Sequence, residues 1–156
     1  MPAVTEINHV SMHARDLQES VEFYVDLLGA EPVASPKFGL PVQWLSLGSP
    51  QLHLFERDLE PTSHHHVGIT VDDLEPVYRA AARRDAFDRE AFGSHLVELP
   101  GDVVQMYVRD PAGNLIEIDQ AGVSRLPAEL RAELKCLWDF HPQTEAEIQG
   151  RLLASS

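Results

Sequence analysis

Two segments of the chain, 57 residues apart, carry the same pattern of residues. When INHVSMHARDLQES is placed above HHHVGITVDDLEPV, His9 falls on His66, Val10 on Val67, Asp16 on Asp73 and Leu17 on Leu74. A pattern that occurs only twice is typical of a duplicated module rather than of a solenoid, which needs several stacked copies. The duplication therefore restricts the chain to two similar halves whose sheets pair.

Each half of the duplication begins with the pattern of a strand and continues as a helix. In the first half the helix follows Asp16, which can cap it together with Glu19, and ends at Gly29. Leu17, Val21, Tyr24 and Leu28 are predicted to form its apolar face, as are Leu74, Val77, Tyr78 and Ala81 in the second half.

The similarity resumes downstream, where VQWLSLGSPQLHLFE resembles VQMYVRDPAGNLIEID. Both read as two strands joined by a turn. Segments 30–35 and 85–92 are predicted to add one strand to each half. The predicted fold is α+β, with two paired βαβββ modules, residues 4–58 and 62–121, that form a curved and mainly antiparallel sheet cup. Residues 1–123 then make one domain.

Residues 124–156 lie outside the duplication and are predicted to be a helical extension. Apolar residues recur at helical spacing through LPAELRAELKCLW, and TEAEIQGRLL opens with Thr144 and Glu147 in capping-box spacing. Two helices are expected to cover a sheet face or a partner subunit. Cys136, the only cysteine, is expected to be a small core residue of the first helix.

The composition excludes several classes of partner. Lys and Arg total 12 against 25 for Asp and Glu, which gives a net charge of −13 and leaves no basic stripe for nucleic acid. No apolar run approaches the roughly 20 residues of a membrane span. A single cysteine suits a reducing compartment. We therefore expect a soluble, cytoplasmic protein that binds a small molecule.

Strand alternation places candidate metal ligands on the polar side of the strands. His53 lies between Leu52 and Leu54, and Glu117 between Ile116 and Ile118, so each side chain points away from an apolar face. Burying an unpaired glutamate would cost several kcal/mol, and a cation removes that cost. Imidazoles with one carboxylate suit one divalent ion of Fe, Mn, Co, Ni or Zn.

The segments INHVSMHARDLQESVEFYVDLLG, HHHVGITVDDLE and YVRDPAGNLIEI resemble the vicinal oxygen chelate superfamily, which includes glyoxalases, bleomycin resistance proteins and extradiol dioxygenases. The resemblance covers roughly residues 5–120. It implies paired βαβββ modules around one divalent metal, held at the positions of His9, His66 and Glu117. His53 stands where some subfamilies place a fourth ligand.

The resemblance also implies a homodimer, because in several relatives the modules that form one site come from two subunits. By that analogy His9 and His53 of one chain meet His66 and Glu117 of its partner. The duplication is equally compatible with a site formed within one chain.

Three chemistries are open. The first is a glyoxalase-like isomerase, epimerase or lyase in which His53 is the base. Metal-dependent glyoxalase I differs from this chain in having a carboxylate at this position. Its arginine-lined glutathione site also has no clear counterpart here. The second is an Fe(II) ring-cleaving dioxygenase, which resembles this chain in Tyr107 as well as in the ligands. The third is a drug-binding resistance protein without catalysis.

We rank proton transfer first, because a fourth ligand at His53 leaves an octahedral iron too few positions for catechol and dioxygen together. Tyr107 is expected to line the pocket. Several residues are given structural roles instead: His13, His64, His65 and His95 as hydrogen-bonded histidines, Phe23, Tyr24 and Trp44 as core, and Arg109 and Asp110 as turn residues.

Overall fold

The computed structural model describes residues 4–150 and 152. It confirms the predicted α+β class, with one four-stranded and one five-stranded sheet. The chain divides into two compact units. The first unit runs up to Thr62 and takes in Asp110–Asn114, and the second comprises Ser63–Arg109 and the residues from Leu115 onward.

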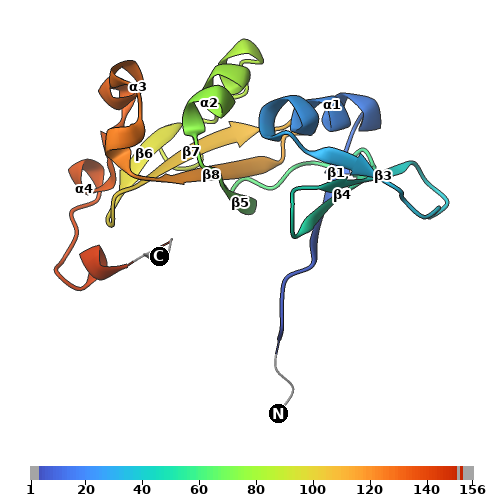
Figure 1. Cartoon of the computed structure of the whole chain (residues 1–156), viewed down its shortest axis with the longest axis horizontal. Helices are drawn as coiled ribbons and strands as arrows, with labels where there is room; N and C mark the ends of the chain where they lie inside the picture. The colour runs from blue at the N-terminus through green and yellow to red at the C-terminus, as the bar shows by residue number, and fades with distance from the viewer. Residues whose placement is uncertain (1–3, 151, 153–156) are drawn as a thin grey trace. The chain divides into compact units, whose positions relative to one another are not determined.

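The first unit is a βαβββ module (Figure 1). Its elements are β1 (His9–Ala14), α1 (Leu17–Leu28), β2 (Glu31–Val33), β3 (Val42–Ser46) and β4 (Gln51–Glu56). The strand order is β1-β4-β3-β2, in which β1 and β4 are parallel and the other pairs antiparallel. Ser11 of β1 and Trp44 of β3 lie beside His53 of β4 in the register.

Helix α1 begins and ends as predicted. The Asp16 carboxylate accepts a hydrogen bond from the Glu19 amide at 2.9 Å, and Gly29 closes the helix with a left-handed φ of 65°. Its buried face is rotated from the predicted one, because Ser20, Phe23, Tyr24 and Leu27 are buried whereas Val21 and Leu28 are half-buried. The Tyr24 hydroxyl donates to Asp110 at 2.8 Å, which ties α1 to the turn after Arg109.

The second unit repeats this topology and extends it. Its order is β5-β8-β7-β6-β9, with β5–β8 and β6–β9 parallel. The elements of the repeated module are β5 (His66–Thr70), α2 (Leu74–Arg83), β6 (Leu96–Leu99), β7 (Val103–Arg109) and β8 (Leu115–Ala121). β7 and β8 are almost wholly buried, which makes them the centre of this unit's core.

The prediction of a strand at residues 85–92 is wrong. The second strand of this module is β6, which begins at Leu96. Only Phe87 of the predicted segment bridges to a strand, at Val108. Asp88 instead accepts hydrogen bonds from the amides of Glu90 and Ala91 and pairs with Arg109 at 2.8 Å. Such local side-chain bonds to the backbone compete with a sheet ladder and favour a turn.

The predicted C-terminal helices are shorter and interrupted. The elements after β8 are η1 (Val123–Arg125), α3 (Ala128–Glu133), β9 (Lys135–Cys136), α4 (Leu137–Phe140) and η2 (Glu147–Gln149). Leu134 turns extended, so that β9 can pair with the edge of β6 instead of continuing the helix. Thr144 and Glu147 make the predicted reciprocal cap, but it holds only a 3-10 turn.

Cys136 is therefore a strand residue and is half-buried rather than part of a helix core. Its thiol lies 3.5 Å from a Glu98 carboxylate oxygen, and burial, followed by that carboxylate, raises the pKa of the thiol. Among the described residues no helix is long and apolar enough to cross a membrane.

Replacing Asp88 with asparagine is expected to lower the free energy of unfolding by about 1–3 kcal/mol, because it removes the carboxylate charge that pairs with the Arg109 guanidinium at 2.8 Å. Burial alone would raise the pKa of Asp88, but the Ala91 amide and Arg109 outweigh it and the pKa is lowered. The stabilisation is thus present above the ordinary pKa of 3.8 and lost as the pH falls through the lower, folded-state value.

Urea unfolding at pH 7 and at pH 3 measures this difference. Asp85→Asn is the matched control, since Asp85 is exposed in the same loop and asparagine tolerates its left-handed φ of 50°. A loss in Asp88→Asn no larger than in the control would contradict the role of Asp88.

Candidate metal centre

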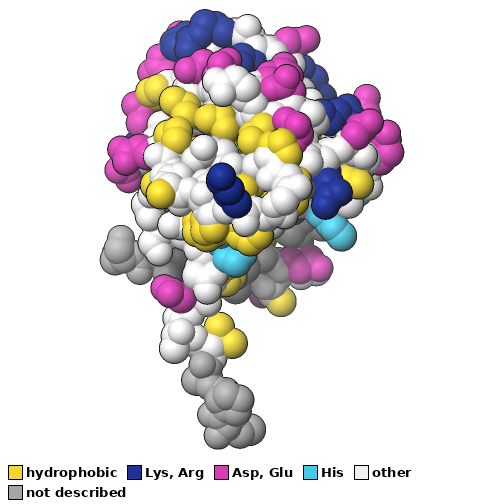
Figure 2. Space-filling view, turned by 90° about the vertical axis from the view of Figure 1, so that its right-hand side faces the viewer, with side chains coloured by type: hydrophobic (Ala, Val, Ile, Leu, Met, Phe, Trp, Pro, Cys, Tyr) yellow, Lys and Arg dark blue, Asp and Glu magenta, His cyan; other side chains and the backbone are white. Residues whose placement is uncertain are grey.

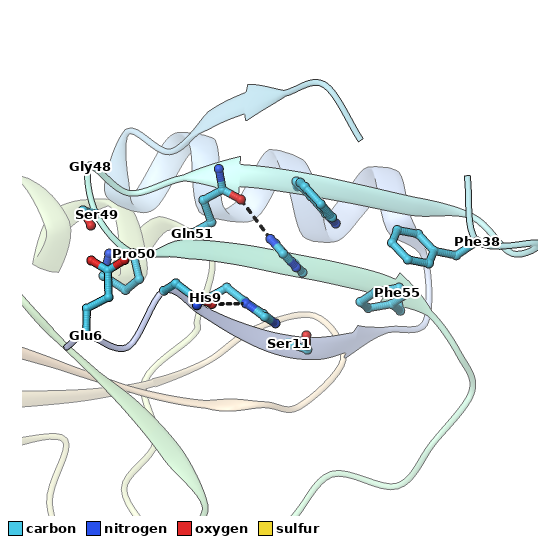
Figure 3. Close-up of a pocket in the computed structure, with 12 residues that line it drawn as sticks. Glu6, His9, Ser11, Phe38, Gly48, Ser49, Pro50, Gln51 and Phe55 are labelled. Carbon is cyan, nitrogen blue, oxygen red and sulfur yellow. Dashed lines mark hydrogen bonds between the residues drawn. The ribbon is translucent and has the colours of Figure 1, made fainter. Parts of the chain in front are cut away.

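The first unit contains a pocket of about 640 Å³ on the face of its sheet that carries the predicted ligands His9 and His53. Figure 3 shows His9 and Ser11 on β1 lining it, with Phe38 and Phe55 at the opposite end from Glu6 and Gly48. The other lining residues are Asn8, Trp44, Ser49, Pro50, Gln51 and His53.

His53 is held between two parallel rings. Its ring centroid lies 4.0 Å from that of Trp44, at an interplanar angle of 3°, and 4.3 Å from that of His9, at 13°. The side chain is 7% exposed. Trp44, predicted as a core residue, is instead half-buried in the pocket wall, because the antiparallel register of β3 and β4 places it beside His53.

Both imidazoles have one nitrogen fixed by a neighbouring amide. His53 Nε2 lies 2.9 Å from Gln51 Oε1, and His9 Nδ1 lies 2.6 Å from Asn8 Oδ1 (Figure 3). An amide oxygen accepts from the ring N–H, so the second nitrogen of each ring keeps its lone pair. Burial, and then the charge of His9, lowers the pKa of His53. His53 is therefore neutral at pH 7.

The second unit contains the other two predicted ligands, in a pocket of about 550 Å³. His66 Nε2 lies 3.4 Å from Glu117 Oε2, and its Nδ1 lies 2.7 Å from the carbonyl oxygen of His64. Donation from Nδ1 to that carbonyl leaves the Nε2 lone pair on the side of Glu117, which is the usual arrangement of a metal-binding histidine.

Tyr107 lines the same pocket and belongs to a polar network at its base. Its hydroxyl donates to Gln105 Oε1 at 2.7 Å. Burial, and then the charge of Glu117, raises the pKa of Tyr107 well above its usual value of 10. The phenol thus stays protonated and is a permanent donor.

Asp119 is a buried carboxyl group near Glu117 that the sequence interpretation missed. It lies two residues beyond Glu117 on β8, is 3% exposed, and its Oδ1 atom has no hydrogen-bond partner. Burial, and then repulsion from Glu117, raises the pKa of Asp119 to about 7. The strand alternation that identified Glu117 also places Asp119 on the same face, and would have found it.

The second unit fits a cation. Glu117 and Asp119 are two buried carboxyl groups on one strand face, and one of their oxygens is unpartnered. A Cβ atom at Gly68 would stand 3.4 Å from Glu117 Oε1 and 3.6 Å from Asp119 Oδ2, so glycine keeps the space beside them open. A divalent ion at Glu117 and His66 would compensate this buried charge.

Each unit therefore holds one pair of the predicted ligands, His9 with His53 and His66 with Glu117. Within neither unit do three or more His, Cys, Asp or Glu side chains of the described residues converge as a metal-binding group. The assembly of the two pairs into one site stays a prediction.

The other histidines have mostly structural surroundings. His13 and His95 each bury an Nε2 atom that has no hydrogen-bond partner among the described residues, which differs from the prediction. His95 is 8% exposed, and its Nε2 lies 3.4 Å from Glu133 Oε2. His64 bonds to the Ser63 hydroxyl, and its ring meets the edge of Phe92 at 5.7 Å. Asp110 shapes its turn as predicted, accepting hydrogen bonds from the amides of Ala112 and Asn114.

Residues 6–118 match the family model of the Glyoxalase/Bleomycin resistance protein/Dioxygenase superfamily. The chain belongs to this superfamily. The match spans both units, including all four predicted ligands, and confirms the resemblance seen in the duplicated segments.

Curated relatives of this superfamily member include mitochondrial methylmalonyl-CoA epimerases. That of Mus musculus is 28% identical over 133 residues, which cover 74% of this chain and 72% of the epimerase. That of Homo sapiens is 26% identical over 133 residues, which cover 74% of this chain and 73% of the epimerase.

Solved structures in the superfamily share the fold. A glyoxalase family protein from Bacillus anthracis superposes with a TM-score of 0.62 at 22% identity, covering 78% of this chain and 98% of that one. Lactoylglutathione lyase from Agrobacterium tumefaciens superposes with a TM-score of 0.58 at 21% identity. The match covers 76% of this chain and 96% of the lyase. These likenesses extend to the fold alone.

Addition of a divalent metal is expected to stabilise the protein against heat. At a free metal concentration about 100 times the Kd, binding contributes about 2.7 kcal/mol, or about 5–10 °C in Tm for a chain of this size. Glu117→Gln should abolish the shift, because it removes the charged ligand. Glu90→Gln, on an exposed loop of the same unit, is the control. Equal shifts in both variants would exclude Glu117 as a ligand.

Mixing two defective variants tests whether sites are shared between subunits. If they are, a dimer of one His9→Ala chain with one Glu117→Ala chain carries both substitutions in one site and none in the other. Random exchange should then restore about a quarter of the metal binding, because about half of the dimers are mixed. Metal binding that stays at zero after subunit exchange would contradict sharing.

Proposed function

We propose that the protein is a divalent-metal-dependent enzyme that moves a proton at a carbon next to a carbonyl group, in the manner of an epimerase or isomerase. The observation that carries the proposal is the state of His53. It is a neutral imidazole, buried in a pocket, and held in a fixed orientation between Trp44 and His9. Among the described residues, no carboxylate forms an ion pair with it that would favour its protonated form.

A general base needs a lone pair that faces the substrate and a pKa near the working pH. The Gln51 amide fixes one nitrogen of His53, and the other is left for the proton. Stacking against Trp44 limits rotation of the ring, which keeps that nitrogen in place. His53 would take the proton from one face of the carbon next to the carbonyl. Epimerisation requires that a proton return to the opposite face, so a second proton donor across the substrate would supply it.

His9, His66 and Glu117 would hold the metal, with His53 as base or as a displaceable fourth ligand. A bound divalent ion would supply Lewis-acid stabilisation of the negative charge that develops on the substrate oxygen. Tyr107, which stays protonated, would turn its hydroxyl from Gln105 to donate a hydrogen bond to a substrate oxygen in the same pocket. Fe, Ni, Co, Zn and Mn all suit this donor set.

The methylmalonyl-CoA epimerase relatives support this reaction type, since the similarity covers about three quarters of this chain. The identity of 28% does not carry the substrate over. We further propose a cytoplasmic homodimer, in which each site takes one small-molecule substrate.

The ring-cleaving dioxygenase is the second candidate, and Tyr107 beside Glu117 is the observation that favours it. Oxygen uptake by the anaerobically purified, Fe(II)-loaded protein with catechol distinguishes the two. Uptake that depends on catechol would replace the proposed reaction with ring cleavage.

Proton exchange in D₂O tests the proposed reaction directly. Metal-loaded protein is incubated with methylmalonyl-CoA and with acetoin, a small α-hydroxy ketone, and deuterium incorporation is followed by NMR. His53→Gln should slow exchange by about 10²–10⁴-fold, because the base is lost. The exposed His65 provides the control, His65→Gln. Undiminished exchange in His53→Gln would exclude His53 as base, and no exchange with either probe would count against the reaction.

A further inference from the structure

The C-terminal extension forms one wall of the pocket that contains Glu117. The superfamily match ends at residue 118 and the duplication ends near Ala121, so this segment belongs to neither. Three of its residues nevertheless line the pocket together with His66, Tyr107 and Glu117. They are Leu137, Phe140 and His141.

The extension is anchored rather than loosely attached. β9 pairs with the edge of β6 at Val97 and Glu98, adding the fifth strand to the sheet. Glu133 of α3 accepts hydrogen bonds from the Tyr78 hydroxyl at 2.9 and 2.8 Å. Leu130 of α3 is 1% exposed. Residues 137–141 follow directly after this anchored strand, which fixes their position at the pocket.

Much of the pocket lining is apolar. Leu137 packs against the buried cluster of Val97, Tyr107 and Leu115. Phe92 stacks on Tyr107 with ring centroids 4.7 Å apart, and Phe140 remains 37% exposed. The remaining apolar lining comes from Ala91, Val97 and Leu99. No Lys or Arg of the described chain lines the pocket, so it offers an anionic group no permanent positive charge.

On the face in Figure 2, acidic and basic side chains are interspersed with hydrophobic ones and form no single large patch of one kind. The pocket in the second unit is thus the feature that combines candidate ligands, an apolar wall and a segment outside the superfamily match.

We infer that residues 137–141 determine specificity, and that the substrate carries a compact apolar group, aromatic or branched aliphatic, next to the oxygens that chelate the metal. Phe140 and Leu137 would contact this group while His66 and Glu117 hold the metal. The inference rests on the proposed function, because it assigns an orientation to the substrate of that site.

Hydroxamates test the inference, since they chelate a divalent metal through two adjacent oxygens and differ only in their substituent. The affinities of acetohydroxamate and benzohydroxamate for the metal-loaded protein are measured by titration calorimetry. Wild type should bind benzohydroxamate at least about 10-fold more tightly, because the phenyl group is removed from water against Phe140. Phe140→Ala should lose most of this preference and leave acetohydroxamate affinity within about twofold.

Trp138→Ala is the matched control, since Trp138 lies on the same short helix, is 40% exposed and does not line the pocket. It should keep the wild-type preference. Equal binding of the two hydroxamates by wild type, or an unchanged preference in Phe140→Ala, would overturn the role of the extension and leave the proposed function standing. If neither hydroxamate binds the metal-loaded protein, the proposed function fails together with the inference.

Discussion

The structure of the candidate centre depends on a carboxylate that is buried without a permanent cation beside it. Glu117 is 6% exposed on β8, its nearest basic partner is the His66 imidazole at 3.4 Å, and Asp119 adds a second carboxyl group two residues away. Burial of such a pair is costly in an apolar setting. A bound cation would remove this cost, and this connects the fold to the proposed chemistry.

Much of the fold could be predicted because the duplication constrains it. The caps at Asp16 and Asp73 and the faces on which His53 and Glu117 lie follow from helix and strand periodicity. The prediction of a strand at 85–92 was wrong for a local reason. The Asp88 carboxylate accepts hydrogen bonds from nearby backbone amides, and an apolar pattern does not reveal such bonds. The interrupted helix before Cys136 failed because the free edge of β6 is a tertiary partner, which no local propensity describes.

In the candidate site, too, some features follow from local periodicity and others from tertiary pairing. Strand alternation finds the faces on which His9, His66 and Glu117 lie, and it would also have found Asp119. The ring stack of Trp44, His53 and His9 comes from cross-strand register, and the wall at Phe140 comes from a segment after the duplication. Candidate ligands can thus be proposed from the sequence, whereas the residues that line the pockets beside them depend on tertiary pairing.

The most direct test of the central claim is a crystal structure of the metal-loaded protein with an anomalous difference map recorded at the absorption edge of the metal. We expect one strong peak per site, about 2.0–2.2 Å from imidazole nitrogens of His9 and His66 and from a carboxylate oxygen of Glu117. All three side chains are expected to bind the same ion. A peak bound by His9 and His53 alone, by His66 and Glu117 alone, or by surface carboxylates and water would contradict the proposed centre.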